Sequence, residues 1–414
     1  MVGTLLTPAV GMVTGIVVLR HLAPAETGLL NNLAVIPAYL AFLQLGVFSG
    51  LSRELPFHRG AGEHARAQRL VTTAAGAATW IAVLGAIPCL LGALIHRLRG
   101  GDALGSWGLV AMAVVGFASP VTAHLETSLR GLQEFNRLGW GVLAANAAAL
   151  LLNGLVAAFG VTGGLLRLAL AAVAGMLARF RRDLWWWHGR VDWLRAKELA
   201  HVGFPLMLSG SFFSLLMVAD RSLVAVFLDK EQAGQFALAG LIVNSMQFLP
   251  QSLSVVLFPR IAKHYGATGS SRALRRFLWI SLGFNVATIV PVSLLAYGTV
   301  GPLIGWLFPK YVSGVPAAKI ACLTCLCWIY LGVGSVIGVV NRMKPYLTAM
   351  LGSLALIWGL GWWLIHTGHG IEGAAWARFA GTLILCVFTI AYSFYLTRVE
   401  IVPAAPIRTE HGTT

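Results

Sequence analysis

The chain has 414 residues, of which 57% are hydrophobic and 11% are charged, against about 25% charged residues in soluble domains. A soluble fold of this length would have too few charges to cover its surface. The net charge of +15 would suit a nucleic-acid-binding protein, but the basic residues gather in connections between long apolar runs. The N-terminal apolar stretch has no basic n-region and no small-residue cleavage site, so it reads as a first span rather than a signal peptide. The composition predicts an all-α, multi-pass membrane protein and excludes nucleic acid as a partner.

Twelve apolar runs follow one another along the chain, each of about 18–25 residues and long enough to cross a membrane as a helix. The boundary between the fifth and sixth runs, within residues 159–164, is the least defined. The twelve predicted spans lie near residues 1–20, 29–50, 71–95, 107–128, 140–159, 161–179, 201–228, 235–257, 277–297, 316–340, 346–365 and 371–396.

The distribution of basic residues predicts the orientation of these spans. The connections after even-numbered spans, together with the C-terminal tail, hold 21 of the 30 Lys and Arg residues. Because cytoplasmic loops carry an excess of Lys and Arg, both termini are expected in the cytoplasm.

An internal repeat indicates two halves. Residues 51–70 and 257–276, which lie 206 positions apart, are identical at seven of twenty positions, and the same offset pairs Leu22 with Leu228 and Gly28 with Gly234. Since 206 is close to half the chain length, the sequence predicts two parallel repeats of six spans each, as in transporters built from two lobes. The expected domains are an N-terminal lobe (1–180), an interfacial linker rich in Trp and Arg (181–200), a C-terminal lobe (201–397) and a cytoplasmic tail (398–414).

Three ionisable residues lie inside predicted spans of the C-terminal lobe. Asp220 and Arg221 are in the seventh span and Arg378 is in the twelfth, at about the same depth from the outer side. Ionisable groups at bilayer depth usually face a cavity or a partner. A neutralising pair of Asp220 with Arg378 or with Arg221 is therefore expected. Such a pair serves either function or fold stability, and side chains that extend to the interface are a third interpretation.

The eighth span carries amide side chains on one helical face, at Asn244, Gln247 and Gln251. Since a polar stripe is unfavourable against lipid, these residues are expected either to line a central cavity or to bond between helices. Asn31 and Asn32 in the second span are weaker candidates of the same kind.

Other polar residues favour ordinary structural roles. Glu126 and Arg130 have the spacing of a helix-surface ion pair, and His124 is expected to be a satisfied helix-end histidine rather than a proton relay. No catalytic constellation or nucleotide-binding motif appears, so an enzyme is not expected. Three cysteines without accompanying His, Asp or Glu indicate small packing residues rather than a metal site, namely Cys322, Cys325 and Cys327.

Several segments, taken together, resemble the polysaccharide transporter branch of the MATE-like superfamily, which includes O-antigen and exopolysaccharide flippases. They are VVLRHLAPAETGLLNNLAV (17–35), LGVFSGLSRELPFHRG (45–60) and SLRGLQEFNRLG (128–139) in the first lobe, and LAHVGFPLMLSGSF (199–212), DRSLVAVFLDKEQAGQFALAG (220–240) and LPQSLSVVLFPRIAKHYG (249–266) in the second. Their order and duplication are fairly specific to the family, though not to a substrate.

The resemblance implies a V-shaped bundle of two six-helix lobes around a central cavity that works by alternating access. Family substrates are polyprenyl-pyrophosphate-linked oligosaccharides, which move from the cytoplasmic to the periplasmic leaflet. The resemblance thus implies a protein of the bacterial cytoplasmic (inner) membrane. Because such a head group is anionic and rich in hydroxyls, cations and amides are the expected ligands. The candidates for substrate binding are Arg221, Arg378, Asn244, Gln247 and Arg20, the last near the outer end of the first span. Asp220 is the candidate for coupling to H⁺ or Na⁺.

Two other functions stay open from the sequence. One is a cation-coupled multidrug exporter of the same fold, and the other is a non-transporting membrane scaffold of a polysaccharide assembly complex. We expect no cofactor and no metal, a monomeric state, and contact with membrane lipids. A polysaccharide polymerase and glycosyltransferases are the expected protein partners.

Overall fold

The computed structural model describes residues 2–60, 62–181, 184, 192–247, 250, 257, 260–261, 264–265, 270–340 and 342–399. Within these ranges every regular element is a helix and no strand occurs. The first half of the chain forms α1 (Val2–His21), α2 (Pro24–Leu40), η1 (Ala41–Gln44), α3 (Val47–Gly60), α4 (His64–Leu98), α5 (Ala103–Gly131), α6 (Phe135–Leu151) and α7 (Asn153–Arg179). The second half forms α8 (Trp193–Phe227), α9 (Lys230–Gln235), α10 (Ala237–Met246), η2 (Ser271–Leu274), α12 (Arg275–Leu307), η3 (Pro309–Gly314), α13 (Val315–Leu326), η4 (Cys327–Tyr330), α14 (Ser335–Val339), α15 (Met343–Leu364), η5 (Ile365–His369) and α16 (Gly370–Arg398).

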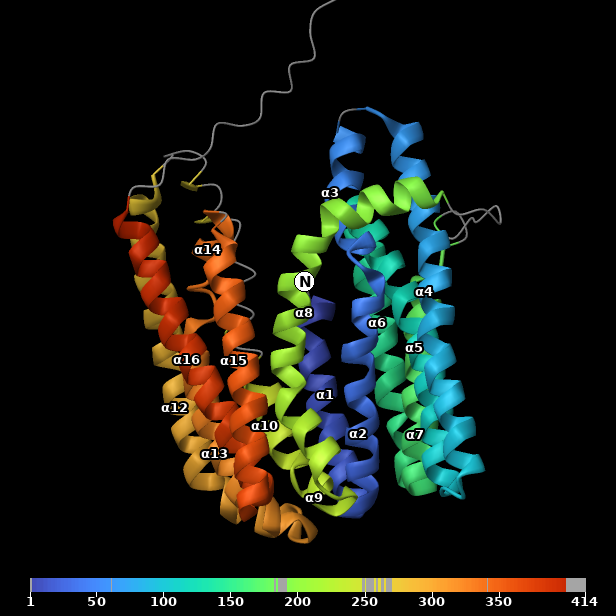
Figure 1. The fold of residues 1–414 in the computed structure, drawn as a ribbon, viewed down its shortest axis with the longest axis vertical. Helices are drawn as coiled ribbons and strands as arrows, with labels where there is room; N and C mark the ends of the chain where they lie inside the picture. The colour runs from blue at the N-terminus through green and yellow to red at the C-terminus, as the bar shows by residue number, and fades with distance from the viewer. Residues whose placement is uncertain are drawn as a thin grey trace, which may run out of the picture.

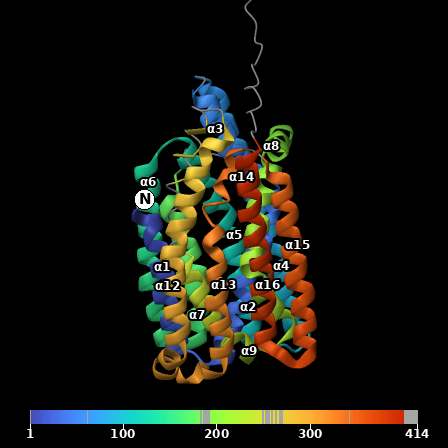
Figure 2. The same cartoon turned by 90° about the vertical axis from the view of Figure 1, so that its left-hand side faces the viewer.

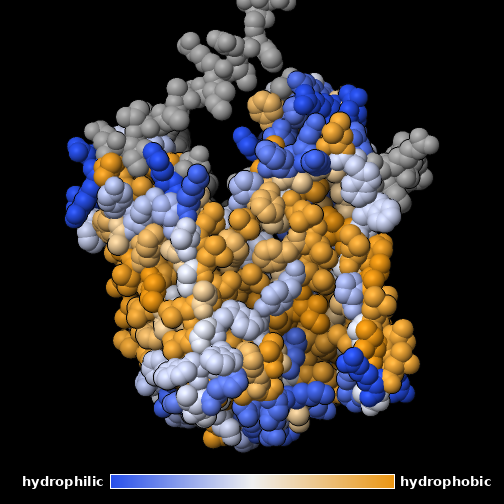
Figure 3. All heavy atoms as spheres, viewed as in Figure 1, coloured by the Kyte–Doolittle hydropathy of each residue, from blue (hydrophilic) through white to orange (hydrophobic). Residues whose placement is uncertain are grey.

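The helices form two bundles whose axes run roughly along the long dimension of the molecule (Figures 1 and 2). One bundle contains α1–α7 and the other contains α10 and α12–α16, with α8 between them (Figure 1). An apolar belt surrounds the middle of the visible face, while hydrophilic residues gather at both ends (Figure 3). This distribution is that of a multi-pass membrane protein with two lobes. We call the two ends of the molecule the α3 end and the α9 end.

In the described ranges, seven helical stretches are long and apolar enough to cross a membrane, or eight if the bent pair Pro24–Gln44 and Val47–Gly60 is one span. The stretch Asn153–Arg179 reverses direction at Gly160, which has φ 57° and ψ −135°. The reversal brings the two sides of the turn together, because a Cβ added at Gly163 would lie 1.8 Å from the Leu155 carbonyl oxygen. The stretch Met343–Arg398 breaks at Gly368 and Gly370, both with positive φ. Gly160 lies at the predicted boundary between the fifth and sixth spans. The number of twelve spans itself stays a prediction.

The first copy of the repeat, residues 51–70, forms the end of α3 and the start of α4, which project beyond the apolar belt at the α3 end (Figures 1 and 3). Its histidine, His58, is buried and lies 2.8 Å from a carboxylate oxygen of Glu63 and 3.4 Å from one of Glu54. These contacts stabilise the turn between the two helices. Eight residues of the second copy, 257–276, lie outside the described residues, namely 258, 259, 262, 263 and 266–269.

Helix α2 bends by 55° where it passes through η1 into α3. Pro37 removes one main-chain donor from the helix, and Leu45 and Gly46 then adopt positive φ angles of 45° and 90°. After this bend α3 packs against the start of α8, because small residues let the two backbones meet. A Cβ added at Gly50 would lie 2.1 Å from the Leu199 carbonyl oxygen.

The start of α8 therefore packs on the first lobe, although in sequence it lies in the predicted linker that follows that lobe. Leu199 is buried in one cluster with Leu51 and Leu125 of the first lobe, and the Trp193 ring lies 6.3 Å from that of Trp80. The predicted linker 181–200 is thus partly helical from Trp193 onward. The other three predicted interfacial tryptophans, at 185–187, lie outside the described residues.

The lobes meet closely at the α9 end. An added Cβ at Gly28 would lie 1.7 Å from the Lys230 carbonyl oxygen and 2.9 Å from the Gly234 nitrogen, and one at Gly234 would lie 1.7 Å from the Pro24 carbonyl oxygen. The two glycines that the repeat pairs in sequence therefore pack against each other across the lobes. Only glycine fits at either position.

A buried tyrosine adds polar contacts to this closure. The Tyr311 hydroxyl lies 2.7 Å from the Thr27 hydroxyl and donates to the Leu22 carbonyl oxygen at 3.0 Å. At the opposite α3 end, the space-filling view shows a notch between the two lobes (Figure 3). The described residues of the two lobes are therefore in contact at the α9 end and are separated by this notch on the visible face at the α3 end.

Candidate functional site

A cavity of about 190 Å³ lies between the lobes and takes walls from both of them. The first lobe contributes α1, α2 and α7, and the second contributes α8 and α10. Most of the lining is apolar or glycine, so the polar side chains stand out. They are Thr14, Thr27, Asn31, Arg167, Arg221 and Asn244.

Arg221 enters the cavity from α8. One of its guanidinium nitrogens donates to the Gly240 carbonyl oxygen at 3.2 Å. The absence of a side chain at Gly240 makes this approach feasible, since a Cβ there would lie 2.6 Å from that nitrogen. Among the described residues, no carboxylate lies within 4.0 Å of the Arg221 guanidinium; Asp220 accepts from the Arg221 main-chain N–H instead. The guanidinium is therefore available to a ligand.

Arg167 enters the same cavity from α7, on the first-lobe side. It donates to the Thr14 hydroxyl at 3.2 Å, and that hydroxyl also accepts from Asn153 at 3.1 Å. Its Nε is buried without a hydrogen-bond partner, and no carboxylate in the described part of the chain forms an ion pair with it. Each lobe thus contributes one arginine without an acidic partner to the cavity.

Arg167 was missed in the sequence, where it was counted among the basic residues of the outer connections. The available signal was its position inside the predicted span 161–179, within the apolar run LLRLAL. The chain reverses at Gly160, so Arg167 lies about two helical turns inside α7. Arg167 is therefore a cavity-lining cation of the first lobe.

Asp220 and Arg378 form the expected neutralising pair, with 3.1 Å between Asp220 Oδ1 and the Arg378 guanidinium. Their side chains are 7% and 2% exposed, so both are enclosed in the second lobe. Arg378 also contacts the Met217 sulfur at 3.6 Å. Arg378 does not line the inter-lobe cavity, which corrects its assignment as a cavity residue. Its guanidinium is already occupied by Asp220.

The amide residues divide between the cavity and the helix packing. Asn244 and Asn31 line the cavity, and Asn32 lies beside Arg221 in a small adjoining space. Gln247 does not line the cavity and instead donates to the Met217 sulfur at 3.4 Å. Gln251 lies outside the described residues. The polar stripe of the eighth span therefore serves both of its expected roles, at different residues.

Arg20, the first-lobe candidate, does not line the cavity. It lies in the last turn of α1 and is exposed. The short distance between Arg20 and the predicted outer end of its span explains this placement, because a long cationic side chain there reaches water. Arg167 takes its place as the cation of the first lobe.

A second charged cluster lies at the α3 end of the first lobe. Glu126 pairs with Arg130 at 3.2 Å, as its spacing predicted, and also with the buried Arg179 at 2.9 Å. His124 is fully buried, and its Nε2 lies 3.1 Å from the Leu184 carbonyl oxygen. These residues connect helices within one lobe and are separate from the cavity.

No metal centre is found in the part of the chain that the structure describes, since no group of three or more His, Cys, Asp or Glu could hold an ion. The cysteines at 322, 325 and 327 are buried packing residues, as the sequence predicted.

Comparisons with known proteins agree with this architecture. A family model described as "Polysaccharide biosynthesis protein" matches residues 1–264. No curated protein matches the chain in sequence. An inward-facing multidrug resistance MATE transporter of the MOP superfamily superposes with a TM-score of 0.73 at 14% identity, over 96% of this chain and 94% of that one.

Two further solved structures share the fold. The lipid II flippase MurJ, in an inward closed conformation, has a TM-score of 0.69 at 14% identity. The superposition covers 95% of this chain and 87% of the MurJ chain. A MOP superfamily transporter from Pyrococcus furiosus, described by the reversed polarity of its binding pocket, has a TM-score of 0.59 at 15% identity over 96% and 93%. At such identities these likenesses show the fold alone. The chain belongs to the polysaccharide biosynthesis protein family and has the fold of the MATE-like transporters.

Proposed function

We propose that this protein is a flippase that carries a polyprenyl-pyrophosphate-linked oligosaccharide across the bacterial inner membrane, for surface polysaccharide synthesis. One observation carries the proposal: two arginines without acidic partners, one from each lobe, line the same cavity between the lobes. The family of the chain supports a role in polysaccharide biosynthesis.

The chemistry of the cavity suits an anionic, hydroxyl-rich head group. Guanidinium groups bind phosphate through several parallel hydrogen bonds, and such bonds are stronger away from water. Asn31, Asn244 and Thr27 supply donors and acceptors that fit sugar hydroxyls. Because the two arginines stand on different lobes, one pyrophosphate bound between them would link the movements of both.

The proposed direction of transport is supported by the expected orientation of the lobes. The positive-inside rule assigns the α3 end, with its basic α3–α4 connection, to the cytoplasm. Closure at the α9 end and the notch at the α3 end then correspond to a cavity that receives substrate from the cytoplasmic side (Figure 3). Alternating access would close the α3 end and open the α9 end, so that the head group leaves toward the periplasm.

Asp220 is our proposed coupling group, with Arg378 as the partner it must release. A carboxylate that exchanges an arginine for H⁺ or Na⁺ would change the packing of α8 against α16, and α8 also carries Arg221. The lipid-linked glycan, the bilayer, and a neighbouring polymerase and glycosyltransferases complete the proposed set of partners, with the protein acting as a monomer.

The competing function of a multidrug exporter for cationic compounds is disfavoured by the same cavity. Its described lining contains two arginines and no carboxylate. A cationic drug would meet like charges there, which weakens its binding.

The test uses a deletion strain of the source bacterium that carries plasmid-encoded variants. Deletion should accumulate lipid-linked glycan in the inner leaflet, and Arg167→Gln or Arg221→Gln should reduce export by about 10- to 100-fold, since each loses charge-assisted bonds worth about 1.5–3 kcal/mol. Arg20→Gln, which removes an exposed arginine outside the cavity, is the matched control and should export normally. Normal export by Arg167→Gln and Arg221→Gln at normal protein levels would contradict the proposal. The alternative of a non-transporting scaffold predicts normal export even when Asp220, Arg221 and Arg378 are replaced together.

A further inference from the structure

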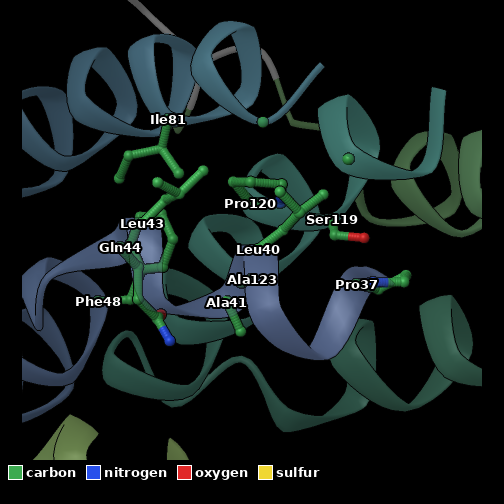
Figure 4. A pocket seen from close by; sticks show the side chains of 12 residues that line it. Pro37, Leu40, Ala41, Leu43, Gln44, Phe48, Ile81, Ser119, Pro120 and Ala123 are labelled. Carbon is green, nitrogen blue, oxygen red and sulfur yellow. The ribbon is translucent and has the colours of Figure 1, made fainter. Parts of the chain in front are cut away.

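A second pocket, of about 120 Å³, lies within the first lobe beside the bend of α2 (Figure 4). Its walls come from α2 and η1 on one side and from α4 and α5 on the other. Ile81 of α4 faces Leu43, and Ser119 of α5 lies beside Leu40 (Figure 4). Gln44 and Ser119 are the polar side chains among the lining residues. The pocket is therefore suited to a hydrocarbon group rather than to a sugar or a phosphate.

The pocket is preformed by the helix geometry. On one side, the 55° bend directs α3 away toward α8 and leaves a space beneath η1. On the other, α4 and α5 cross at Gly85 and Gly116, where an added Cβ on either glycine would lie 3.0–3.1 Å from the other's carbonyl oxygen. This crossing fixes the opposite wall. A pocket of this size is smaller than a complete ligand site, so it would hold part of a larger molecule.

Helix α2 contributes to the lining of both this pocket and the inter-lobe cavity. Thr27, Asn31 and Ala34 line the cavity, and the lining of the pocket begins one turn later with Pro37 and continues to Leu40. The nine residues from Asn31 to Leu40 correspond to about 14 Å along the helix axis. A hydrocarbon chain attached to an anionic group in the cavity would have to span about this distance to reach the pocket.

We propose that the pocket receives the isoprenoid chain of the lipid-linked substrate, in the segment next to its pyrophosphate. The inference rests on the proposed flippase function, because it assigns the head group to Arg167 and Arg221. Its independent support is the apolar lining and its position on α2, one turn beyond the residues that line the cavity. The pocket would select substrates by the chain that follows the pyrophosphate, and the glycan would remain in the cavity.

Two water-soluble probes separate head-group binding from chain binding. Inorganic pyrophosphate presents the head alone, and geranyl pyrophosphate adds a short isoprenoid chain. With the purified full-length protein in detergent, geranyl pyrophosphate should bind at least about tenfold more tightly, since burial of even a few methylene-sized groups accounts for that ratio. The measurement is the dissociation constant of each probe by isothermal titration calorimetry.

Variants that fill the pocket test where the chain lies. Ala41→Phe and Ser119→Leu should remove the advantage of geranyl pyrophosphate and leave the affinity for inorganic pyrophosphate unchanged, which also shows that the variants are folded. Ala144→Phe, at an exposed alanine of α6 outside both cavities, is the matched control and should retain the advantage. If both pocket variants keep the full advantage, the chain does not bind here and the inference is wrong.

The same measurements distinguish this inference from the proposed function. If Arg167→Gln and Arg221→Gln leave pyrophosphate binding intact, the assignment of the head group fails, and with it the inference. If they abolish it while Ala41→Phe has no effect on geranyl pyrophosphate, only the chain pocket is refuted. Native mass spectrometry supplies a further outcome: loss of a co-purified phospholipid from Ala41→Phe, with unchanged geranyl pyrophosphate affinity, would assign the pocket to a bilayer lipid instead.

Discussion

Removing one member of the Asp220–Arg378 pair should destabilise the second lobe far more than removing both. The two side chains are 7% and 2% exposed and lie 3.1 Å apart, so neither charge has water in place of its partner. Arg378→Met leaves the Asp220 carboxylate buried and unpaired, which costs about 3–5 kcal/mol. The double variant Asp220→Leu/Arg378→Met leaves no buried charge and should differ from the wild type by about 1 kcal/mol or less, because apolar residues often replace a buried pair without loss.

The assay is thermal unfolding in detergent, followed by tryptophan fluorescence, with the two single variants, the double variant and the wild type compared under one condition. Arg20→Met, at an exposed arginine, controls for the loss of a positive charge. Recovery of stability in the double variant, combined with lost export in cells, would assign the pair a role in transport beyond stability. Equal destabilisation by the single and double variants would refute the reasoning, since it would show that packing rather than charge compensation holds these helices together.

Two further variants test the cavity and its closure. Gly240→Ala places a Cβ 2.6 Å from the Arg221 guanidinium and should lower pyrophosphate affinity about as much as Arg221→Gln does. Gly210→Ala, with open space around it, is the control and should have no effect. If Gly240→Ala binds pyrophosphate as the wild type does, the ligand lies elsewhere. Tyr311→Phe loses the buried hydroxyl bonded to Thr27 and should weaken closure at the α9 end by about 1–3 kcal/mol. The measurement is the distance between spin labels across that end, which should become longer. An unchanged distance distribution would mean that the glycine contacts alone maintain closure.

Residues near the axis that relates the two lobes show which contacts could be predicted from the sequence. The repeat paired Gly28 with Gly234 by offset alone, and the structure brings these two residues into contact. In a two-fold arrangement a residue near the axis meets its own counterpart, so an internal duplication predicts such contacts without coordinates. A buried partner for Asp220 was predictable for a different reason, although the sequence left Arg378 and Arg221 as alternatives and the structure decided for Arg378. An ionisable group at bilayer depth needs a partner, and few candidates exist at matching depth.

The residues that line the inter-lobe cavity were harder to predict from the sequence. Arg167 and Arg221 line it, whereas Arg378 is enclosed and Arg20 is exposed, although all four are arginines in or beside apolar runs. Depth along a span can be read from the sequence, but the direction in which a side chain points around the helix depends on which neighbours the helix contacts. Gly160 illustrates the point, because its reversal sets where Arg167 falls on α7.

The sequence by itself determined the membrane location, the two-lobed repeat and the need of Asp220 for a buried partner, because all three follow from composition, periodicity and the cost of charge in hydrocarbon. Only the tertiary structure decided that the two unpaired arginines share one cavity, that the start of α8 packs on the first lobe, and that the bend of α2 leaves an apolar pocket beside that cavity. These features depend on how helices distant in sequence pack together, and in an apolar chain nearly every helix face is compatible with both lipid and protein.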